Sequence, residues 1–309
     1  MLERYRLPMN LFFRLLTAAA ASVVIIVILG VFFTLLVESA PAVKNFGLIS
    51  FIVGTKWDPV NNIYAGGRPL AGTLLTTATA LLFAVPIALG IAVFITELCP
   101  HAFRQVVSSA IELLAAIPSI IYGMWGLFVL APILENTIQP VISGSLGLMP
   151  IIGSFFQASQ TGGVNLFTAS VVLAIMIIPF IASITRDTFL LVPPILKESA
   201  YGMGATCWEV IKDVVLPYSK MGVAGGIIIA AGRALGETMA VAYVIGNRHG
   251  ALKSIFSPYT TITSVLANEF NEASGIQMSS LYFLALILLV TNLLVLSLAK
   301  FVLRGSASK

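Results

Sequence analysis

The chain has 309 residues, of which 58% are apolar and only 10% are charged. A soluble domain of this size needs many more charged side chains on its surface, so the composition excludes an ordinary soluble protein and favours one embedded in a lipid bilayer. The net charge of +4 comes without a basic stripe interleaved with aromatic residues, so nothing indicates that the chain binds nucleic acid.

Long apolar runs predict where the chain crosses the membrane, because about 20 helical residues span a hydrocarbon core of about 30 Å. The first run is longer than the apolar part of a cleaved signal peptide, so we interpret it as a signal anchor. The sequence predicts an all-α, polytopic membrane protein with a membrane domain at 15–304 and short cytoplasmic tails at 1–14 and 305–309. The six predicted spans lie at about 15–37, 71–98, 106–134, 164–184, 221–246 and 280–299.

Lysine and arginine predict the orientation, because cytoplasmic flanks carry an excess of both. With the N-terminus inside, eleven basic residues lie on the inner side and five on the outer side, so both termini are predicted to be cytoplasmic. The uncharged stretch at 136–185 could be argued to hold a seventh span. Several glycines and Pro150 interrupt its first half, which we interpret as an extracytoplasmic segment that lies partly on the membrane.

Signatures of enzymes and cofactor sites are absent from the sequence. No glycine-rich loop of the G-x-x-x-x-G-K-[ST] type occurs, so any ATPase that drives this protein must be a separate subunit. His101 and His249 belong to no catalytic triad. Cys99 and Cys207 fall in separate loops, which argues against a disulfide or a metal site. We therefore expect a chain without catalytic residues, metal or cofactor.

The cytoplasmic segment between the fourth and fifth spans, at about 192–218, has the most specific pattern. Gly204 permits a bend between two short helices, and Thr206 followed by Glu209 predicts a capping box that starts the second helix. Pro217 is predicted to end that helix. An apolar stripe on it needs a surface that buries it, either a partner protein or its own bundle and the lipid. The stripe consists of Cys207, Trp208, Ile211, Val214 and Val215.

Arg233 lies near the middle of the predicted fifth span, where a charged side chain costs at least about 2.5 kcal/mol on insertion scales. Glu237 follows at i+4, so the two side chains are expected to pair on one helix face. Gly232 and Gly236 form a G-x-x-x-G motif, which predicts that another helix or a substrate approaches closely. We interpret these residues as a station for an anion in the substrate pathway, with a structural salt bridge as the alternative.

Other features of the spans are less specific. Glu112 in the third span is a further candidate for the pathway, and facing interfacial water is the equal alternative. Pro86, Pro118 and Pro179 predict one kink each in the second, third and fourth spans.

The cytoplasmic segment resembles the EAA loop of ABC importer permeases. Glu198, Ala200, Gly204 and the ending at 214–217 match that motif, whereas Ser199 replaces its usual alanine. In that family the loop supplies the coupling helices that sit in a groove of the ATPase. The resemblance therefore implies an ATPase coupling loop that includes Glu198, Ala200, Gly204, Trp208, Leu216 and Pro217.

Three further runs resemble the C-type permease subunits of bacterial phosphate importers. The runs at 112–126 and 232–241 are specific to phosphate-type permeases, and the exterior run at 54–59 favours the C-type. The resemblance implies the six-helix fold of ABC importer permeases in the bacterial cytoplasmic membrane, with Arg233 and Glu237 as transport-linked charges. It also implies a heterodimer with a sister permease, two cytoplasmic ATPase subunits and an extracytoplasmic phosphate-binding protein.

The residues alone leave alternatives open. Sulfate or molybdate would satisfy the same physics as phosphate. A secondary carrier or channel would need no ATPase, and it would carry ion-coupling carboxylates in several spans, whereas this chain has one convincing intramembrane carboxylate. A membrane-embedded sensor would move no substrate, and changing Arg233 would then alter signalling but not uptake.

Overall fold

The structure, a computed structural model, describes residues 3–149, 153–157, 159 and 161–307. In these ranges six helical segments are long and apolar enough to cross a membrane, which confirms the predicted all-α class and number of spans. The ends of the predicted tails, at 1–2 and 308–309, and the interruption predicted at Pro150 lie outside the described residues. The six segments are 12–46, 67–98, 119–148, 166–190, 207–235 and 275–301.

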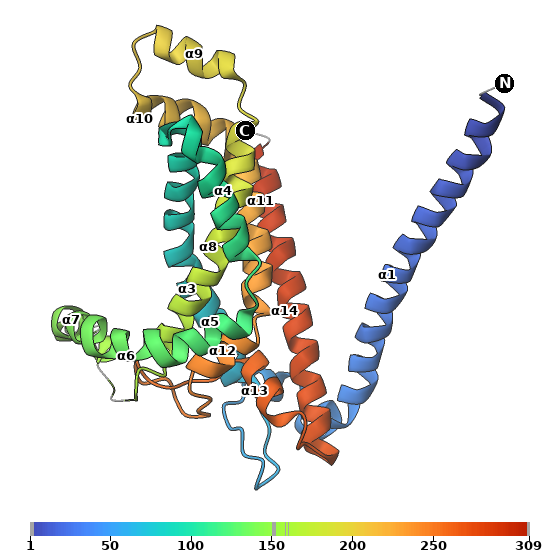
Figure 1. The fold of residues 1–309 in the computed structure, drawn as a ribbon. Coiled ribbons are helices and arrows are strands. Elements are labelled where there is room, and N and C mark those ends of the chain that lie inside the picture. The colour runs from blue at the N-terminus through green and yellow to red at the C-terminus, as the bar shows by residue number, and fades with distance from the viewer. Residues whose placement is uncertain (1–2, 150–152, 158, 160, 308–309) are drawn as a thin grey trace.

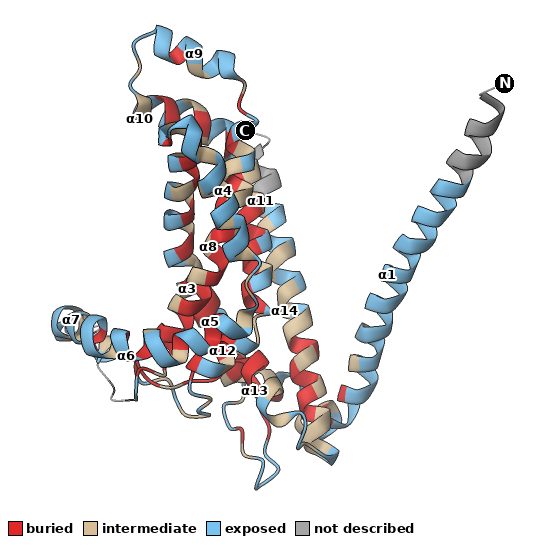
Figure 2. Ribbon diagram, in the orientation of Figure 1, coloured by how far each residue is buried: buried red, intermediate tan, exposed pale blue. Residues whose placement is uncertain are grey.

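Four long helices form the central bundle, and Figure 1 shows them side by side. They are α3 (Gly67–Val93), α8 (Leu166–Leu190), α11 (Leu216–Leu235) and α14 (Gly275–Ala307). Helix α8 is the most buried, and it packs against both α3 and α11 (Figure 2). Helix α14 covers the other side of α11. The main apolar core therefore lies around α8.

Small residues bring these helices together. Ala80, Ala84 and Ala88 recur every fourth residue along α3 and are fully buried in the core with α8. On α11, a Cβ added at Gly226 would lie 2.8 Å from the side chain of Ile184 on α8, too close for any larger residue. Without a hydrophobic driving force in lipid, such close backbone approach is a main source of helix association.

Helix α1 (Glu3–Phe46) packs on α14 only along its C-terminal half, and Figure 1 shows its N-terminal half diverging from the bundle. Residues 12–31 are exposed in this single chain (Figure 2). Apart from Arg14 and two hydroxyl side chains these residues are apolar around the whole helix, so they must contact lipid or another protein chain. The helix is also longer than the span predicted at 15–37.

The third crossing is interrupted at Pro118, where the sequence predicted only a kink within the span at 106–134. Helix α4 (His101–Ala115) runs from the α10 end of the bundle along α8, and α5 (Ser119–Trp125) begins after Pro118 and lies nearer to the opposite end (Figure 1). Proline lacks an N–H and disfavours helix in the residue before it, which accounts for the break. The segment that follows, up to α7 (Gln139–Ser145), turns away from the bundle axis, although its length and composition would suit a span.

Shorter helices gather at the two ends of the bundle. They are α2 (Leu48–Val53), α6 (Ala131–Ile133), α9 (Pro194–Gly202), α10 (Cys207–Val210), α12 (Met239–Val244) and α13 (Ile262–Glu269). Helices α9 and α10 lie at the same end as the first described residues of α1 and the last of α14, whereas α2 and α13 lie at the opposite end (Figure 1). Short π- or 3-10-helical turns occupy Phe94–Leu98, Gly126–Leu130, Leu134–Ile138, Leu146–Leu148, Gly153–Phe156 and Ile211–Val215.

Candidate functional site

The fifth span breaks in the middle of the candidate substrate site. Helix α11 ends at Leu235, Gly236 caps it, and α12 starts three residues later, so the prediction of one helix at 221–246 was wrong. Glu237 lies in the break, where its Oε1 accepts a hydrogen bond from the backbone N–H of Ala240 at 3.3 Å. The carboxylate thus satisfies one of the free N–H groups in the first turn of α12, which stabilises the interruption.

The predicted ion pair between Arg233 and Glu237 was also wrong. No salt bridge joins them in the part of the chain that the structure describes, because the i+4 relation requires a helix that continues past Gly236. The Arg233 guanidinium instead lies over the ring of Phe180 on α8, 5.8 Å from its centroid. Arg233 is also in the last turn of α11, where the partial negative charge of the helix end stabilises a cation.

Arg233 is exposed in this single chain. It lies 13 residues beyond Lys220, or about 20 Å along α11, which places it inside a hydrocarbon core of about 30 Å and about 5 Å past the middle of that core. A guanidinium facing lipid at such a depth costs at least about 2.5 kcal/mol. Its exposed side therefore has to face water or another protein chain.

The two glycines of the predicted G-x-x-x-G motif differ in their surroundings. A Cβ added at Gly232 would lie 3.2 Å from the Leu296 side chain and 3.5 Å from Asn292 Oδ1, so α14 does approach closely, as predicted. Gly236 has no atom nearer than 3.8 Å, because it lies in the turn between two helices. Only Gly232 serves as a close-contact residue.

Sequence reasoning missed a cluster of threonines beside Glu237. They line a cavity of about 10 Å³ next to the helix break, which has room for a single water. The Thr263 hydroxyl donates a hydrogen bond to the Glu237 carbonyl at 2.7 Å, and Thr76 Oγ1 is buried with no partner in the described residues. Hydroxyls at i, i+3 and i+4 of an otherwise apolar helix are the signal that could have found them. The cluster comprises Thr73, Thr76, Thr77, Thr261 and Thr263.

The predicted capping box in the cytoplasmic segment is confirmed. Thr206 Oγ1 accepts the Glu209 N–H at 3.4 Å, and the Glu209 carboxylate accepts the Thr206 N–H at 2.7 Å. Gly204 precedes it with a φ of 89°. This is the left-handed region, which side chains other than glycine rarely adopt. The bend between α9 and α10 therefore depends on Gly204.

The chain itself covers part of the apolar stripe of this segment, so for these residues the surface that buries them is its own bundle, one of the two alternatives that the sequence left open. Ile211 and Val215 are buried, and Val215 packs together with Val210 against the C-terminal ends of α3 and α8. Packing against the bundle therefore buries this part of the stripe, which the spacing of apolar residues alone could not predict. Trp208 is 66% exposed and Met203 is 85% exposed, so an apolar face remains there.

The remaining residues of the predicted coupling loop take different places. Ala200 is buried in the same apolar cluster, whereas Glu198 is exposed. Leu216 is half-buried and begins α11. Pro217 does not end the helix as predicted, because the wide π-helical turn at Ile211–Val215 changes the hydrogen-bond register before the proline and the helix continues into α11.

An ion pair that sequence reasoning missed holds the coupling loop to the bundle. Lys197 Nζ on α9 lies 2.6 Å from Glu97 Oε1, in the π-helical turn that follows α3. The Glu97 side chain is only 9% exposed and that of Lys197 only 20%. A shielded pair of this kind links the position of α9 to that of the second span.

Glu112 makes a contact between two spans. Its Oε1 lies 2.9 Å from the Arg186 guanidinium on α8, although 55% of the Glu112 side chain is exposed. Asp187 also pairs with Arg186, at 2.7 Å. The structure therefore gives Glu112 a partner, and its role in the pathway remains a prediction.

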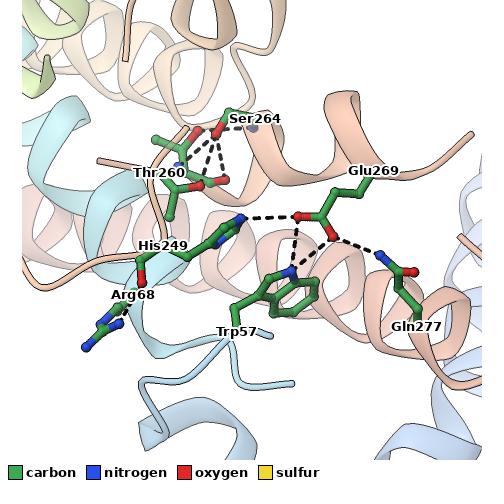
Figure 3. Close-up of polar contacts among 8 residues, drawn as sticks. Trp57, Arg68, His249, Thr260, Ser264, Glu269 and Gln277 are labelled. Atoms are coloured by element: carbon green, nitrogen blue, oxygen red, sulfur yellow. Dashed lines mark hydrogen bonds and ion pairs between the residues drawn. The ribbon is translucent and has the colours of Figure 1, made fainter. Parts of the chain in front are cut away.

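A second polar network, at the end of the bundle opposite α9 and α10, joins the loop around Trp57 and the start of α3 to the loop around His249, to α13 and to α14 (Figure 3). Glu269 at the end of α13 accepts hydrogen bonds from Trp57 Nε1 and from Gln277, each at 3.0 Å, and lies 3.2 Å from His249 Nε2. Arg68 donates to the His249 carbonyl at 2.6 Å. The Trp57 and His249 rings stack, with centroids 6.0 Å apart. This network fixes the two loops to each other.

Changing Glu269 to Gln is expected to destabilise the protein in a pH-dependent way. Burial would raise the pKa of Glu269, but hydrogen bonds from His249, Trp57 and Gln277 hold the pKa below its ordinary value of 4.5. A lowered pKa means that the ionised carboxylate stabilises the fold above about pH 4.5 and that this contribution is lost as the pH falls further. We expect a loss of about 1–3 kcal/mol at pH 7.

The measurement is the unfolding midpoint in lipid nanodiscs at pH 7 and near pH 4. Glu272→Gln is the matched control, because Glu272 is exposed in the same loop and has no ion pair in the described residues. The difference between Glu269→Gln and wild type should shrink at the lower pH. An equal difference at both pH values would contradict the role given to the ionised carboxylate.

Known proteins resemble this chain along most of its length. A family model described as "Binding-protein-dependent transport system inner membrane component" matches residues 84–306. The chain is 50% identical over 288 residues to the phosphate transport system permease protein PstC of Haemophilus influenzae, covering 93% of this chain and 91% of that one. It is 50% identical over 275 residues to the protein of the same name from Mesorhizobium japonicum, covering 89% and 84%.

Solved ABC transporters share the fold. A bacterial alginate ABC transporter, in complex with its alginate pentasaccharide-bound periplasmic protein, matches with a TM-score of 0.58 and 18% identity over 86% of each chain. The MetNI methionine ABC transporter in an inward-facing conformation matches with a TM-score of 0.56 and 19% identity, over 77% of this chain and 94% of that one. The predicted permease fold and the resemblance to phosphate permeases are both confirmed.

Members of this family are transport components rather than enzymes. The six apolar helices of this chain are what a membrane component of such a transport system requires. The chain is therefore a multi-pass inner membrane protein and belongs to the family of binding-protein-dependent transport system inner membrane components, among the relatives of the phosphate transport system permease protein PstC.

Proposed function

We propose that this chain is the membrane-spanning permease subunit of an ATP-driven importer and that it moves inorganic phosphate inward across the cytoplasmic membrane. The observation that carries the proposal is Arg233, an exposed cation at membrane depth with no carboxylate partner in the described residues. A pathway for a doubly charged anion needs such a group, because the anion loses its hydration there. The substrate is proposed from relatives whose names state phosphate transport.

A sister permease completes the pathway. Arg233 on α11 and residues 12–31 of α1 are both exposed in the single chain. Lipid alone can cover the apolar residues of α1, but it does not explain an exposed guanidinium. A second permease that packs against this side of the bundle encloses a water-filled space between the two chains. In that space Arg233 offsets part of the anion's desolvation cost, and the break at Gly236 gives the backbone a point at which the helix can bend.

Two cytoplasmic ATPase subunits are proposed to drive transport by hydrolysing ATP. One of them docks on the exposed apolar face of the coupling loop, which includes Met203 and Trp208. This end of the bundle is then cytoplasmic, and so are both termini, because the first described residues of α1 and the last of α14 lie there (Figure 1). Movement of α9 reaches the second span through the ion pair of Lys197 with Glu97.

An extracytoplasmic phosphate-binding protein docks at the opposite end. That end presents α2, α13 and the loop around Trp57, which the Glu269 network holds together. A rigid exterior surface suits the repeated docking of a separate protein, because little ordering is needed on binding. ATP binding and hydrolysis then switch the enclosed space between outward and inward access.

Uptake of labelled phosphate into vesicles tests this function. The vesicles hold this chain with its sister permease, the ATPase and the binding protein, and sulfate and molybdate are added in turn as competitors. We expect uptake that requires ATP and is unaffected by either competitor. Equal competition by sulfate or molybdate would mean that the importer is not selective for phosphate. Uptake without ATP would favour a secondary carrier.

A further inference from the structure

A polar cavity of about 330 Å³ opens at the α9 and α10 end of the bundle, between α4, α8 and the turn after α3. Helix α4 supplies six of its lining residues, at i, i+3, i+4, i+7, i+8 and i+11, which places them on one helix face. The opposite face of α4 is apolar and exposed (Figure 2). The six residues are His101, Arg104, Gln105, Ser108, Ser109 and Glu112.

The positive charges in this cavity are unequally compensated. Arg186 also lines it, but its guanidinium is held by Glu112 at 2.9 Å and by Asp187 at 2.7 Å. Arg104 has no carboxylate within ion-pair distance among the described residues. Its Nη2 donates to the Cys99 carbonyl at 3.4 Å, and its Nε is buried without a partner. Arg104 therefore brings an uncompensated positive charge to the cavity.

Neutral donors lie beside this cation on the same helix face. The side chains of Gln105, Ser108 and Ser109 have no hydrogen-bond partner in the part of the chain that is described. Arginine with neighbouring hydroxyls is a common arrangement for phosphate groups, because the guanidinium fork binds two oxygens and hydroxyls reach the others. At about 30 Å³ per water, the cavity has room for an oxyanion and several waters.

We propose that this cavity binds a phosphate group on the cytoplasmic side of the membrane, with Arg104 as its main cationic partner and Ser108 and Ser109 as hydroxyl donors. The side of the membrane and the choice of phosphate rest on the proposed function. The group is either inorganic phosphate or the headgroup of an anionic lipid, because the cavity opens next to the exposed apolar face of α4. The Glu112 carboxylate in its wall keeps binding weak.

This site is separate from Arg233. Arg186 lies six residues beyond Phe180 on α8, so the cavity is about 9 Å nearer to the cytoplasmic end than the ring beneath Arg233, and it is on a different side of α8. Arg104 and Arg233 therefore belong to two distinct cationic sites of the chain.

Protection of a local thiol tests the proposal in the assembled transporter, without binding protein or nucleotide. Gln105→Cys places a thiol in the cavity, and mass spectrometry of the peptide around position 105 follows its reaction with a maleimide. In phosphatidylcholine nanodiscs, added inorganic phosphate should slow this reaction. Adding Arg104→Gln should raise the half-protecting concentration at least about tenfold, or about 1.4 kcal/mol. Lys220→Gln, which removes an exposed charge at the same end, should not.

A second arm replaces phosphatidylcholine by phosphatidylglycerol in phosphate-free buffer. Protection that depends on Arg104 in this arm alone identifies the lipid headgroup as the source, and protection by inorganic phosphate alone identifies the free anion. No protection in either arm, or equal protection in Arg104→Gln, overturns the site. ATP-dependent uptake by the same purified transporter, reconstituted into vesicles with the binding protein and ATP, separates the two ideas, because uptake without protection overturns only the cavity, and protection without uptake overturns only the proposed function.

Discussion

Replacing Arg233 by glutamine is expected to lower phosphate uptake by about 10- to 100-fold, since a hydrogen bond to a charged group contributes about 1.5–3 kcal/mol and each 1.4 kcal/mol is tenfold. Glutamine keeps much of the length of the side chain but removes the charge that offsets desolvation of the anion. Assembly should be unaffected, because Arg233 has no ion pair in the described residues that the substitution would break, only its contact with the Phe180 ring.

The measurement compares ATP-dependent uptake with the amount of assembled transporter in the membrane. Arg233→Lys should keep part of the uptake, because it keeps the charge without the guanidinium fork. Glu237→Gln supplies a further control. Since Glu237 bonds to Ala240 rather than to Arg233, the free-energy effects of the two substitutions should add in the double variant. Strong coupling between them, or loss of assembly in Arg233→Gln, would favour a structural salt bridge.

Local patterns predicted those features that depend on neighbouring residues in the chain. Apolar run length was enough for the six spans, and the Thr206 to Glu209 spacing was enough for the capping box. Both follow from hydrogen-bond geometry within one or two helical turns. Where the chain interrupts a helix, the same extrapolation failed. The i+4 pairing of Arg233 with Glu237 assumed a regular helix through Gly236, and nothing local reveals that the Glu237 carboxylate caps a new helix instead.

The spacing of residues along the chain could not predict contacts between distant segments. Trp57 and Glu269 are 212 positions apart, so their hydrogen bonds follow only from the packed fold. The same holds for Val215, whose burial depends on the C-terminal ends of α3 and α8. The cavity beside α4 is different. Its polar residues recur at helical spacing from His101 to Glu112, and that stripe is visible in the sequence as a helix face unsuited to lipid.

Replacing Gly204 by valine is expected to uncouple ATP hydrolysis from phosphate uptake while the chain remains in the membrane. Gly204 has a φ of 89° with open space around the position of a Cβ, so the cost is backbone strain rather than a clash. A left-handed residue other than glycine costs about 1–2 kcal/mol, and a β-branched side chain is the least tolerated. The bend then relaxes, and the exposed face with Met203 and Trp208 moves relative to the ATPase.

Gly202→Val is the matched control, because Gly202 lies two residues earlier in open space without a positive φ. Uptake and ATPase activity are measured in the same vesicles, and immunoblotting gives the amount of chain and of bound ATPase. Uptake should fall at least about fivefold in Gly204→Val, as 1–2 kcal/mol of strain implies, and remain near wild type in Gly202→Val. Equal losses in both variants would show that any bulk on this loop blocks docking. Unchanged uptake in Gly204→Val would remove the bend from the coupling mechanism, because the strained residue would then be tolerated in the working transporter.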